Sequence, residues 1–151
     1  MSNSLLVEKE EGVVTFTLNR PQSKNAVDLE LCREFMLEAM ALHDDPDVRA
    51  VLIRGAGGTF CSGGDLKAFG SQKGALPAYV REMATYYHGV VSRLAHLDAP
   101  VIAAVDGAAA GAGLSLACAC DIVLAAHSAR FTLAGLSIDG GCARRDPGIY
   151  R

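Results

Sequence analysis

Two stretches rich in glycine and small residues carry the residue types that could do chemistry. They are residues 59–67 (TFCSGGDLK) and residues 106–115 (DGAAAGAGLS). Each follows an apolar run typical of a buried strand, so we expect both at the carboxyl ends of strands, where ligands bind in open α/β sheets. Small residues there let backbone N–H groups approach a ligand oxygen. Two such N–H groups directed at one oxygen form an oxyanion hole that stabilises an enolate. For either stretch alone, the alternative interpretation is that its small residues only allow a helix and a strand to pack closely.

Other functions of glycine-rich segments fit the spacing poorly. A dinucleotide-binding fingerprint beginning at Gly55 needs a glycine where Phe60 stands, and no P-loop sequence occurs. Ser115 lies in the sequence GLSLA, which lacks the final glycine of a nucleophile elbow. The sequence therefore disfavours nucleotide binding through these loops and serine hydrolysis.

The elements that position these stretches follow from hydrophobic periodicity. Residues 5–9 and 13–18 predict a β-hairpin. We expect further strands at 50–54, 101–105 and 121–126. We expect helices from the cap Asp28 to about 43–46, over 76–96, and over about 114–119 after a loop at 107–113. This alternation predicts an α/β fold in a single domain.

Composition narrows the class of ligand. The chain has 151 residues, 50% of them hydrophobic, and a net charge of −3. Mild acidity without a cluster of Lys and Arg argues against nucleic acid or an anionic membrane as partner. The most apolar stretch, residues 107–120, is shorter than the ~20 residues that a membrane span needs, and the first residues do not resemble a secretion signal. We expect a cytoplasmic protein that binds a small molecule.

The cysteines predict neither disulfides nor a metal site. Their number is odd, and most have apolar neighbours in the sequence, which is typical of buried reduced thiols. No pair has the CxxC spacing of a zinc site. The five are Cys32, Cys61, Cys118, Cys120 and Cys142.

Four short motifs occur in order between residues 5 and 141. They are Asn19-Arg20-Pro21 with Asn25-Ala26, residues 60–67, residues 105–107 with 111–113, and residues 119–122. In these motifs the sequence resembles the enoyl-CoA hydratase/isomerase (crotonase) family. The resemblance implies a crotonase-like fold, which is a spiral of ββα units. It also implies that the substrate is an acyl-CoA thioester, in which coenzyme A is part of the substrate, and that no further cofactor is needed. Family members are trimers or hexamers, so the resemblance implies a homo-oligomer.

The resemblance also implies roles for individual residues. The thioester carbonyl is expected between the backbone N–H groups of Gly64 and Ala112. Lys24 and Lys67 are candidates to pair with the phosphates of coenzyme A, or are solvated lysines. The residues expected to border the substrate are Lys24, Ala26, Ser62, Gly64, Asp65, Leu66, Lys67 and Ala112.

The residues at the expected acid and base positions differ from those of the family's hydratases. Family hydratases use two glutamates, and the matching positions here are Ser115 and Gly135, which does not support that route. Asp139 resembles the single carboxylate of family isomerases, although a plain Asp-Gly-Gly turn is the alternative. We therefore expect an enoyl-CoA isomerase in which Asp139 moves the proton. The alternatives are a hydratase or other lyase with different acid and base residues, and a non-catalytic remnant that binds acyl-CoA.

The end of the sequence departs from the family. We expect an acyl-CoA-binding core over residues 1–141 and an atypical tail over residues 142–151, which lacks helical periodicity. The family continues into a C-terminal helical region. We expect that region to be missing, through truncation or a shifted reading frame.

Overall fold

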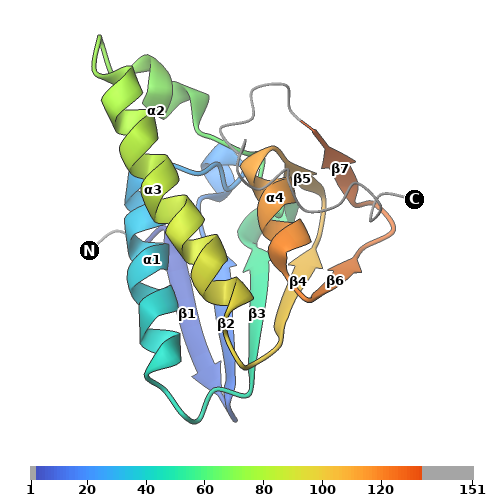
Figure 1. The fold of residues 1–151 in the computed structure, drawn as a ribbon. Helices are drawn as coiled ribbons and strands as arrows, with labels where there is room; N and C mark the ends of the chain where they lie inside the picture. Colours follow the sequence, from blue (N-terminus) through green and yellow to red (C-terminus); the bar gives the residue numbers. More distant parts are fainter. Residues whose placement is uncertain (1–2, 134–151) are drawn as a thin grey trace.

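The computed structural model describes residues 3–133, in which a five-stranded sheet forms one layer (Figure 1). The strands lie in the order β1-β2-β3-β4-β6. They are β1 (Leu5–Glu10), β2 (Val13–Leu18), β3 (Ala50–Gly55), β4 (Val101–Val105) and β6 (Ile122–Ala125). The hairpin β1-β2 is antiparallel and all other pairs are parallel. This confirms the predicted hairpin and the α/β character of the fold.

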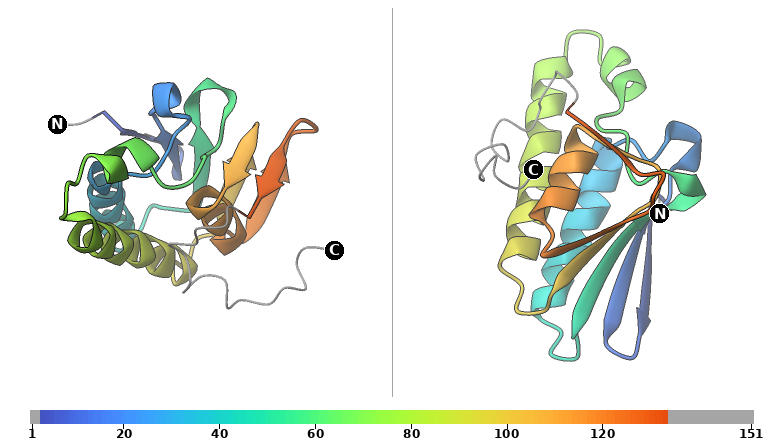
Figure 2. Two further views of the ribbon diagram at one scale, coloured as in Figure 1. Left: turned by 90° about the horizontal axis from the view of Figure 1, so that it is seen from above. Right: turned by 90° about the vertical axis from the view of Figure 1, so that its right-hand side faces the viewer.

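Helices cover one face of this sheet (Figure 2). The longer helices are α1 (Leu29–His43), α3 (Leu76–Ala95) and α4 (Ala112–Ala119). Helix α1 begins where predicted, because the Asp28 carboxylate accepts a hydrogen bond from the Leu31 N–H at 2.9 Å. Such a cap satisfies one of the backbone donors that a helix leaves unpaired at its start.

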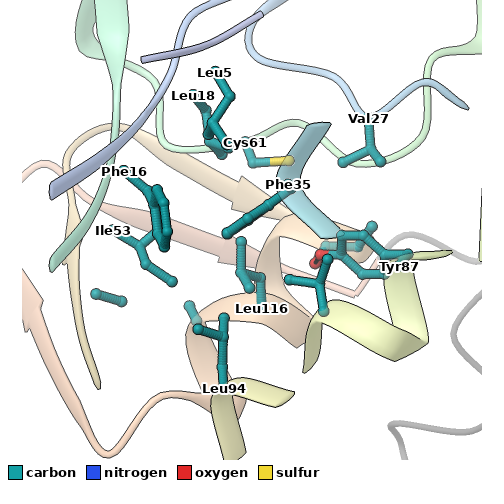
Figure 3. Close-up of a cluster of buried hydrophobic side chains, with 14 of the residues drawn as sticks. Leu5, Phe16, Leu18, Val27, Phe35, Ile53, Cys61, Tyr87, Leu94 and Leu116 are labelled. Atoms are coloured by element: carbon teal, nitrogen blue, oxygen red, sulfur yellow. Dashed lines mark hydrogen bonds between the residues drawn. The ribbon is translucent and has the colours of Figure 1, made fainter. Parts of the chain in front are cut away.

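The core lies between the sheet and these helices (Figure 3). Phe16 of β2 pairs in register with Ile53 of β3, and Ile53 pairs with Ala103 of β4. All three are fully buried. Phe35 of α1 meets Phe16 edge to face, with the ring centroids 5.1 Å apart. The alternating residues of the strands and the stripe along α1 therefore face each other, as their periodicities require.

One expected element is wrong. The loop expected over residues 107–113 contains the strand β5 (Ala108–Ala110), and helix α4 begins at Ala112 rather than near Leu114. Alanine and glycine favour strands weakly, so local propensity did not indicate β5. Tertiary pairing forms it: the Cys61 N–H donates to Ala108 O at 3.0 Å, and the Ala110 N–H donates to Cys61 O at 2.9 Å.

Further short elements lie near the glycine-rich stretches. Strand β5 pairs in parallel with β7 (Arg130–Thr132) in a second, two-stranded sheet. Helix α2 (Leu66–Gly70) begins within the first glycine-rich stretch. Two 3-10 turns lie beside that stretch: η1 (Pro21–Ser23) and η2 (Ala56–Gly58). These elements complete the surface on which the two stretches meet.

Residues 134–151 lie outside the described part of the chain. The boundary expected at residue 141 and the atypical tail therefore stay predictions. Within residues 3–133, no helix combines the length and the hydropathy that crossing a membrane requires.

Candidate active site

The first candidate donor is the backbone N–H of Gly64. The peptide group that joins Gly63 to Gly64 is held through its carbonyl, because the Val27 N–H donates to Gly63 O at 2.7 Å. The Asp65 N–H completes this bridge by donating to Val27 O at 2.8 Å. Since the C=O and N–H of a trans peptide point in opposite directions, the Gly64 N–H is directed away from Val27. No hydrogen bond found among the described residues uses it.

The second candidate donor is the N–H of Ala112, at the first position of α4. The Ser115 N–H donates to Gly111 O at 3.0 Å, so the N–H of the same peptide group points out of the amino-terminal end of the helix. That end carries the positive pole of the helix dipole. Gly111 has a φ of 51° and a ψ of −119°, a conformation that favours glycine. In the part of the chain that the structure describes, the Ala112 N–H also has no protein acceptor.

The two stretches lie against each other. A β-carbon on Gly63 would lie 3.1 Å from Ala110 O and 3.7 Å from the Cα of Gly111. A β-carbon on Gly113 would lie 2.3 Å from Cys61 O, so the backbones approach more closely there than any side chain allows. Segments about fifty residues apart in sequence thus form one surface, and it carries two N–H groups that have no acceptor within the described part of the chain.

An ion-pair cluster holds the loop that precedes α1 against the first stretch. Arg20 Nη2 lies 2.8 Å from Asp28 Oδ2 and 2.9 Å from Asp65 Oδ2, and these three side chains are 9–14% exposed. Nη1 of the same guanidinium donates to Ala26 O. Arg20 therefore joins the end of the hairpin to the caps of two helices. Charge-assisted hydrogen bonds of this kind are among the stronger ones in proteins.

The carboxylate of Asp65 is committed to these contacts. It accepts hydrogen bonds from the N–H groups of Lys67 at 3.0 Å and Ala68 at 3.1 Å, which caps α2. Burial by itself raises the pKa of Asp65, but the hydrogen bonds from the Ala68 N–H and from Arg20 outweigh burial and hold the pKa below its usual value. Asp65 is therefore an ionised structural group near the donors.

Asn25 fixes the same loop from its other side. Its side chain is fully buried and its backbone has a φ of 53°. The carbonyl oxygen of the side chain accepts from the Arg20 N–H at 2.8 Å, and Nδ2 donates to Ala56 O at 2.8 Å and Thr59 O at 2.6 Å. Asn25 thus joins this loop to the turn after β3.

Known proteins are similar to this chain in sequence. A family model described as enoyl-CoA hydratase/isomerase matches residues 8–142. The chain belongs to the enoyl-CoA hydratase/isomerase family. It is 40% identical over 135 residues to a 1,2-epoxyphenylacetyl-CoA isomerase of Escherichia coli, with 89% of this chain and 52% of the relative aligned. It is 34% identical to a 4-chlorobenzoyl coenzyme A dehalogenase of an Arthrobacter species, with 87% of this chain and 48% of the relative aligned.

Solved structures of the family share the fold. The crystal structure of an enoyl-CoA hydratase from Mycobacterium avium subsp. paratuberculosis matches with a TM-score of 0.75 and 35% identity. The match covers 87% of this chain and 48% of that one. The crotonase-like fold expected from the sequence is therefore confirmed. The chain spans about half the length of the curated relatives it matches.

The fold brings together the family-derived positions that lie in the described residues. The Ser62 N–H donates to Lys24 O at 3.1 Å, and Val27 bridges Gly64, so residues 24–27 run beside residues 62–65. Ala26 is 6% exposed between them. The side chains of Lys24, Leu66 and Lys67 are exposed at the edge of this surface.

The structure does not test the expected proton carrier. Asp139 lies outside the described residues, so its role stays a prediction. Ser115, at the position of a family glutamate, is half-buried on α4. The Asp121 carboxylate accepts from the Val101 N–H at 2.8 Å, which ties the end of α4 to β4.

Sequence reasoning missed Arg20 and Asn25 as the residues that build the site. Both stand in a motif that carried the family resemblance, and that was the available signal. Their partners are up to 45 residues away in sequence, so their contacts could not be inferred from spacing.

Three of the four described cysteines are buried or largely covered, as the sequence predicted. Cys32 and Cys61 are buried and Cys120 is largely covered, whereas Cys118 is exposed. Burial raises the pKa of Cys120 to about 12, with a further increase from the nearby Asp121 carboxylate. Among residues 3–133 no group of three or more His, Cys, Asp or Glu side chains is arranged to hold a metal ion.

Proposed function

We propose that the chain binds an acyl-CoA thioester and stabilises the enolate of its acyl group, with the N–H groups of Gly64 and Ala112 on the carbonyl oxygen. One observation carries this proposal. Two neighbouring peptide groups are each held through the carbonyl, by Val27 and Ser115, and neither N–H has an acceptor among residues 3–133. Donors fixed before the substrate arrives lose little free energy when negative charge develops on the oxygen.

The reaction class we favour is isomerisation of an enoyl-CoA. A base removes a proton from the α or γ carbon, the electron pair moves onto the thioester oxygen, and the enolate is protonated again at another carbon. A single carboxylate can perform both transfers. Asp139 is our candidate for that carboxylate.

Lys24 and Lys67 support the choice of coenzyme A as the carrier. Both lie on segments that border the two donors. Both side chains are exposed, and neither ammonium group has a hydrogen-bond or ion-pair partner among residues 3–133. Ammonium groups there are available to the phosphates of the nucleotide. We expect affinity for crotonyl-CoA to fall as salt rises, because exposed charge pairs are screened.

Gly64 offers a paired test of the oxyanion hole. Gly64→Pro deletes the N–H, whereas Gly64→Ala keeps it. The bridge to Val27 uses the Gly63 carbonyl and the Asp65 N–H, so the proline does not remove a bond from it. Gly64 is also not among the glycines with positive φ. We expect Gly64→Pro to slow solvent exchange of the α or γ protons of an enoyl-CoA by roughly 10²–10³-fold relative to Gly64→Ala. Equal exchange in the two folded variants would contradict the assignment.

Binding without catalysis is the second candidate function. Among the described carboxylates near the donors, Asp65 and Asp121 are held in structural hydrogen bonds. Asp139→Asn distinguishes the two functions, because it removes the base and keeps the size of the side chain. Isomerisation predicts that proton exchange falls by orders of magnitude while affinity for crotonyl-CoA is kept. No exchange in the unaltered chain, with affinity intact, would favour binding alone.

A further inference from the structure

Tyr87 of α3 reaches from the core to the turn that carries the second donor. Its side chain is 6% exposed, and its hydroxyl donates to Ala112 O at 2.5 Å. Figure 3 shows Tyr87 among the buried side chains, with Leu116 of α4 nearby. The hydroxyl is thus a buried polar group on an otherwise apolar stripe of α3, and a buried tyrosine hydroxyl usually finds a hydrogen-bond partner.

The position of this hydrogen bond is specific. Ala112 lies between two peptide groups, and its N–H belongs to the group that the Ser115 N–H holds through Gly111 O. The Tyr87 hydroxyl holds the carbonyl of the other group. Both peptide planes that meet at the Cα of Ala112 are therefore held by a hydrogen bond to their carbonyl oxygen. Rotation of the donor N–H would have to stretch one of these two bonds.

We propose that Tyr87 is a positioning residue that fixes the direction of the Ala112 N–H toward the thioester carbonyl. This inference rests on the proposed function. Tyr87 does not contact the thioester in this role; it acts through the backbone of Ala112. Catalytic geometry is sensitive to displacements of this kind, because a shift of about 1 Å can cost roughly 10²-fold in rate.

The test follows the carbonyl of the bound ligand. Crotonyl-CoA labelled with ¹³C at the thioester carbonyl is bound to the chain, and the infrared frequency of that carbonyl is measured. Hydrogen bonds from Gly64 and Ala112 lower the frequency in the unaltered chain. Tyr87→Phe deletes only the hydroxyl, and we expect it to remove about half of this lowering while the affinity changes less than about threefold, since one of two donors is misdirected.

Tyr79→Phe is the matched control. Tyr79 lies on the same helix, and its hydroxyl accepts a hydrogen bond from the Leu29 N–H at 3.1 Å rather than donating to Ala112 O. A general loosening of α3 would affect both variants, whereas a positioning role affects Tyr87→Phe alone. Tyr87→Met, which also lacks the hydroxyl and keeps an apolar side chain, serves if Tyr87→Phe does not fold.

The outcomes separate this inference from the proposed function. An unchanged carbonyl frequency in a folded variant at position 87 would overturn the role of Tyr87 and leave the oxyanion hole standing. No lowering of the frequency in the unaltered chain would overturn both. Equal losses in Tyr87→Phe and Tyr79→Phe would show a structural effect and overturn the positioning role.

Discussion

Gly113 is the residue at which the two glycine-rich stretches approach most closely. An added β-carbon would lie 2.3 Å from Cys61 O and 2.6 Å from the Cβ of Cys61. Both atoms belong to a buried segment that is paired with β5, so neither can move aside easily. The absence of a side chain at Gly113 is what allows α4 to begin beside the first stretch.

Gly113→Ala is expected to lower the free energy of unfolding by about 2–3 kcal/mol, because the methyl group overpacks a buried backbone. Gly70→Ala is the control. Nothing lies within 4 Å of the β-carbon position at Gly70, and alanine suits a helix better than glycine. Urea denaturation of both variants checks this prediction. Equal stabilities would mean that the close approach at Gly113 is not a constraint.

Asp65 makes the stability of the chain depend on pH. Its folded-state pKa lies below the ordinary value of 3.8, so its contribution is fully present above that value and is lost as the pH falls through the lower, folded pKa. The variant Asp65→Asn keeps an oxygen that can cap α2 but weakens the charge-assisted bond to Arg20, so it should lose about 2 kcal/mol at neutral pH. The difference from the unaltered chain should shrink below about pH 3.8. A difference that stays constant with pH in denaturation experiments would contradict the lowered pKa.

One guanidinium group, that of Arg20, contacts the capping residues at the starts of helices α1 and α2. Asp28 caps α1 and Asp65 caps α2, and both carboxylates meet Nη2 of Arg20 within 2.9 Å. Without that charge, two carboxylates would face each other in a poorly solvated space. The elements that carry Lys24, Ala26 and Gly64 are thus placed by a group that takes no direct part in the proposed chemistry.

Arg20→Met is expected to lower the free energy of unfolding by about 3 kcal/mol at neutral pH, since it leaves two partly buried carboxylates unpaired. Arg54→Met is the matched control, because the pair of Arg54 with Glu8 is half exposed, and such pairs contribute at most about 1 kcal/mol. Thermal denaturation of both variants measures the contrast. Similar losses would show that the Arg20 cluster acts as an ordinary surface pair.

The sequence predicted elements whose signal is local and missed those that depend on distant partners. The hairpin and the helices α1 and α3 follow from periodicity, and Asp28 marked the start of α1 correctly. Strands β5 and β7 form because each pairs with a distant segment, which local propensity does not indicate. The Gly64 and Ala112 assignment came from family motifs. Only the structure shows that the carbonyls of their peptide groups are anchored and that the two N–H groups have no acceptor within residues 3–133.

The two edge strands of the main sheet, β1 and β6, differ in how many charged residues they carry. Strand β1 carries Glu8, Lys9 and Glu10, whereas β6 reads Ile-Val-Leu-Ala and carries no charge. Large hydrophobic side chains are exposed around β6 and β7. They are Ile122, Val123, Leu124, Phe131 and Leu133, at 41–79% exposure. Apolar edge strands without charged residues tend to pair with other chains.

We therefore expect the chain to self-associate in a concentration-dependent way, as sedimentation velocity would show. Leu124→Lys should reduce the association, because a charge on an edge strand disfavours strand addition. Leu37→Lys is the control, because Leu37 is similarly exposed, at 68% against 60%, but lies on α1. Equal association of the two variants would exclude β6 as the contact.

The proposed function requires that the N–H groups of Gly64 and Ala112 bind the thioester carbonyl. The most direct measurement compares their amide resonances by ¹H–¹⁵N NMR with crotonyl-CoA and with its thioether analogue, which lacks the carbonyl oxygen. We predict that crotonyl-CoA moves both amide protons downfield and that the thioether does not. Equal shifts with the two ligands, or no shift at either amide, would contradict the account.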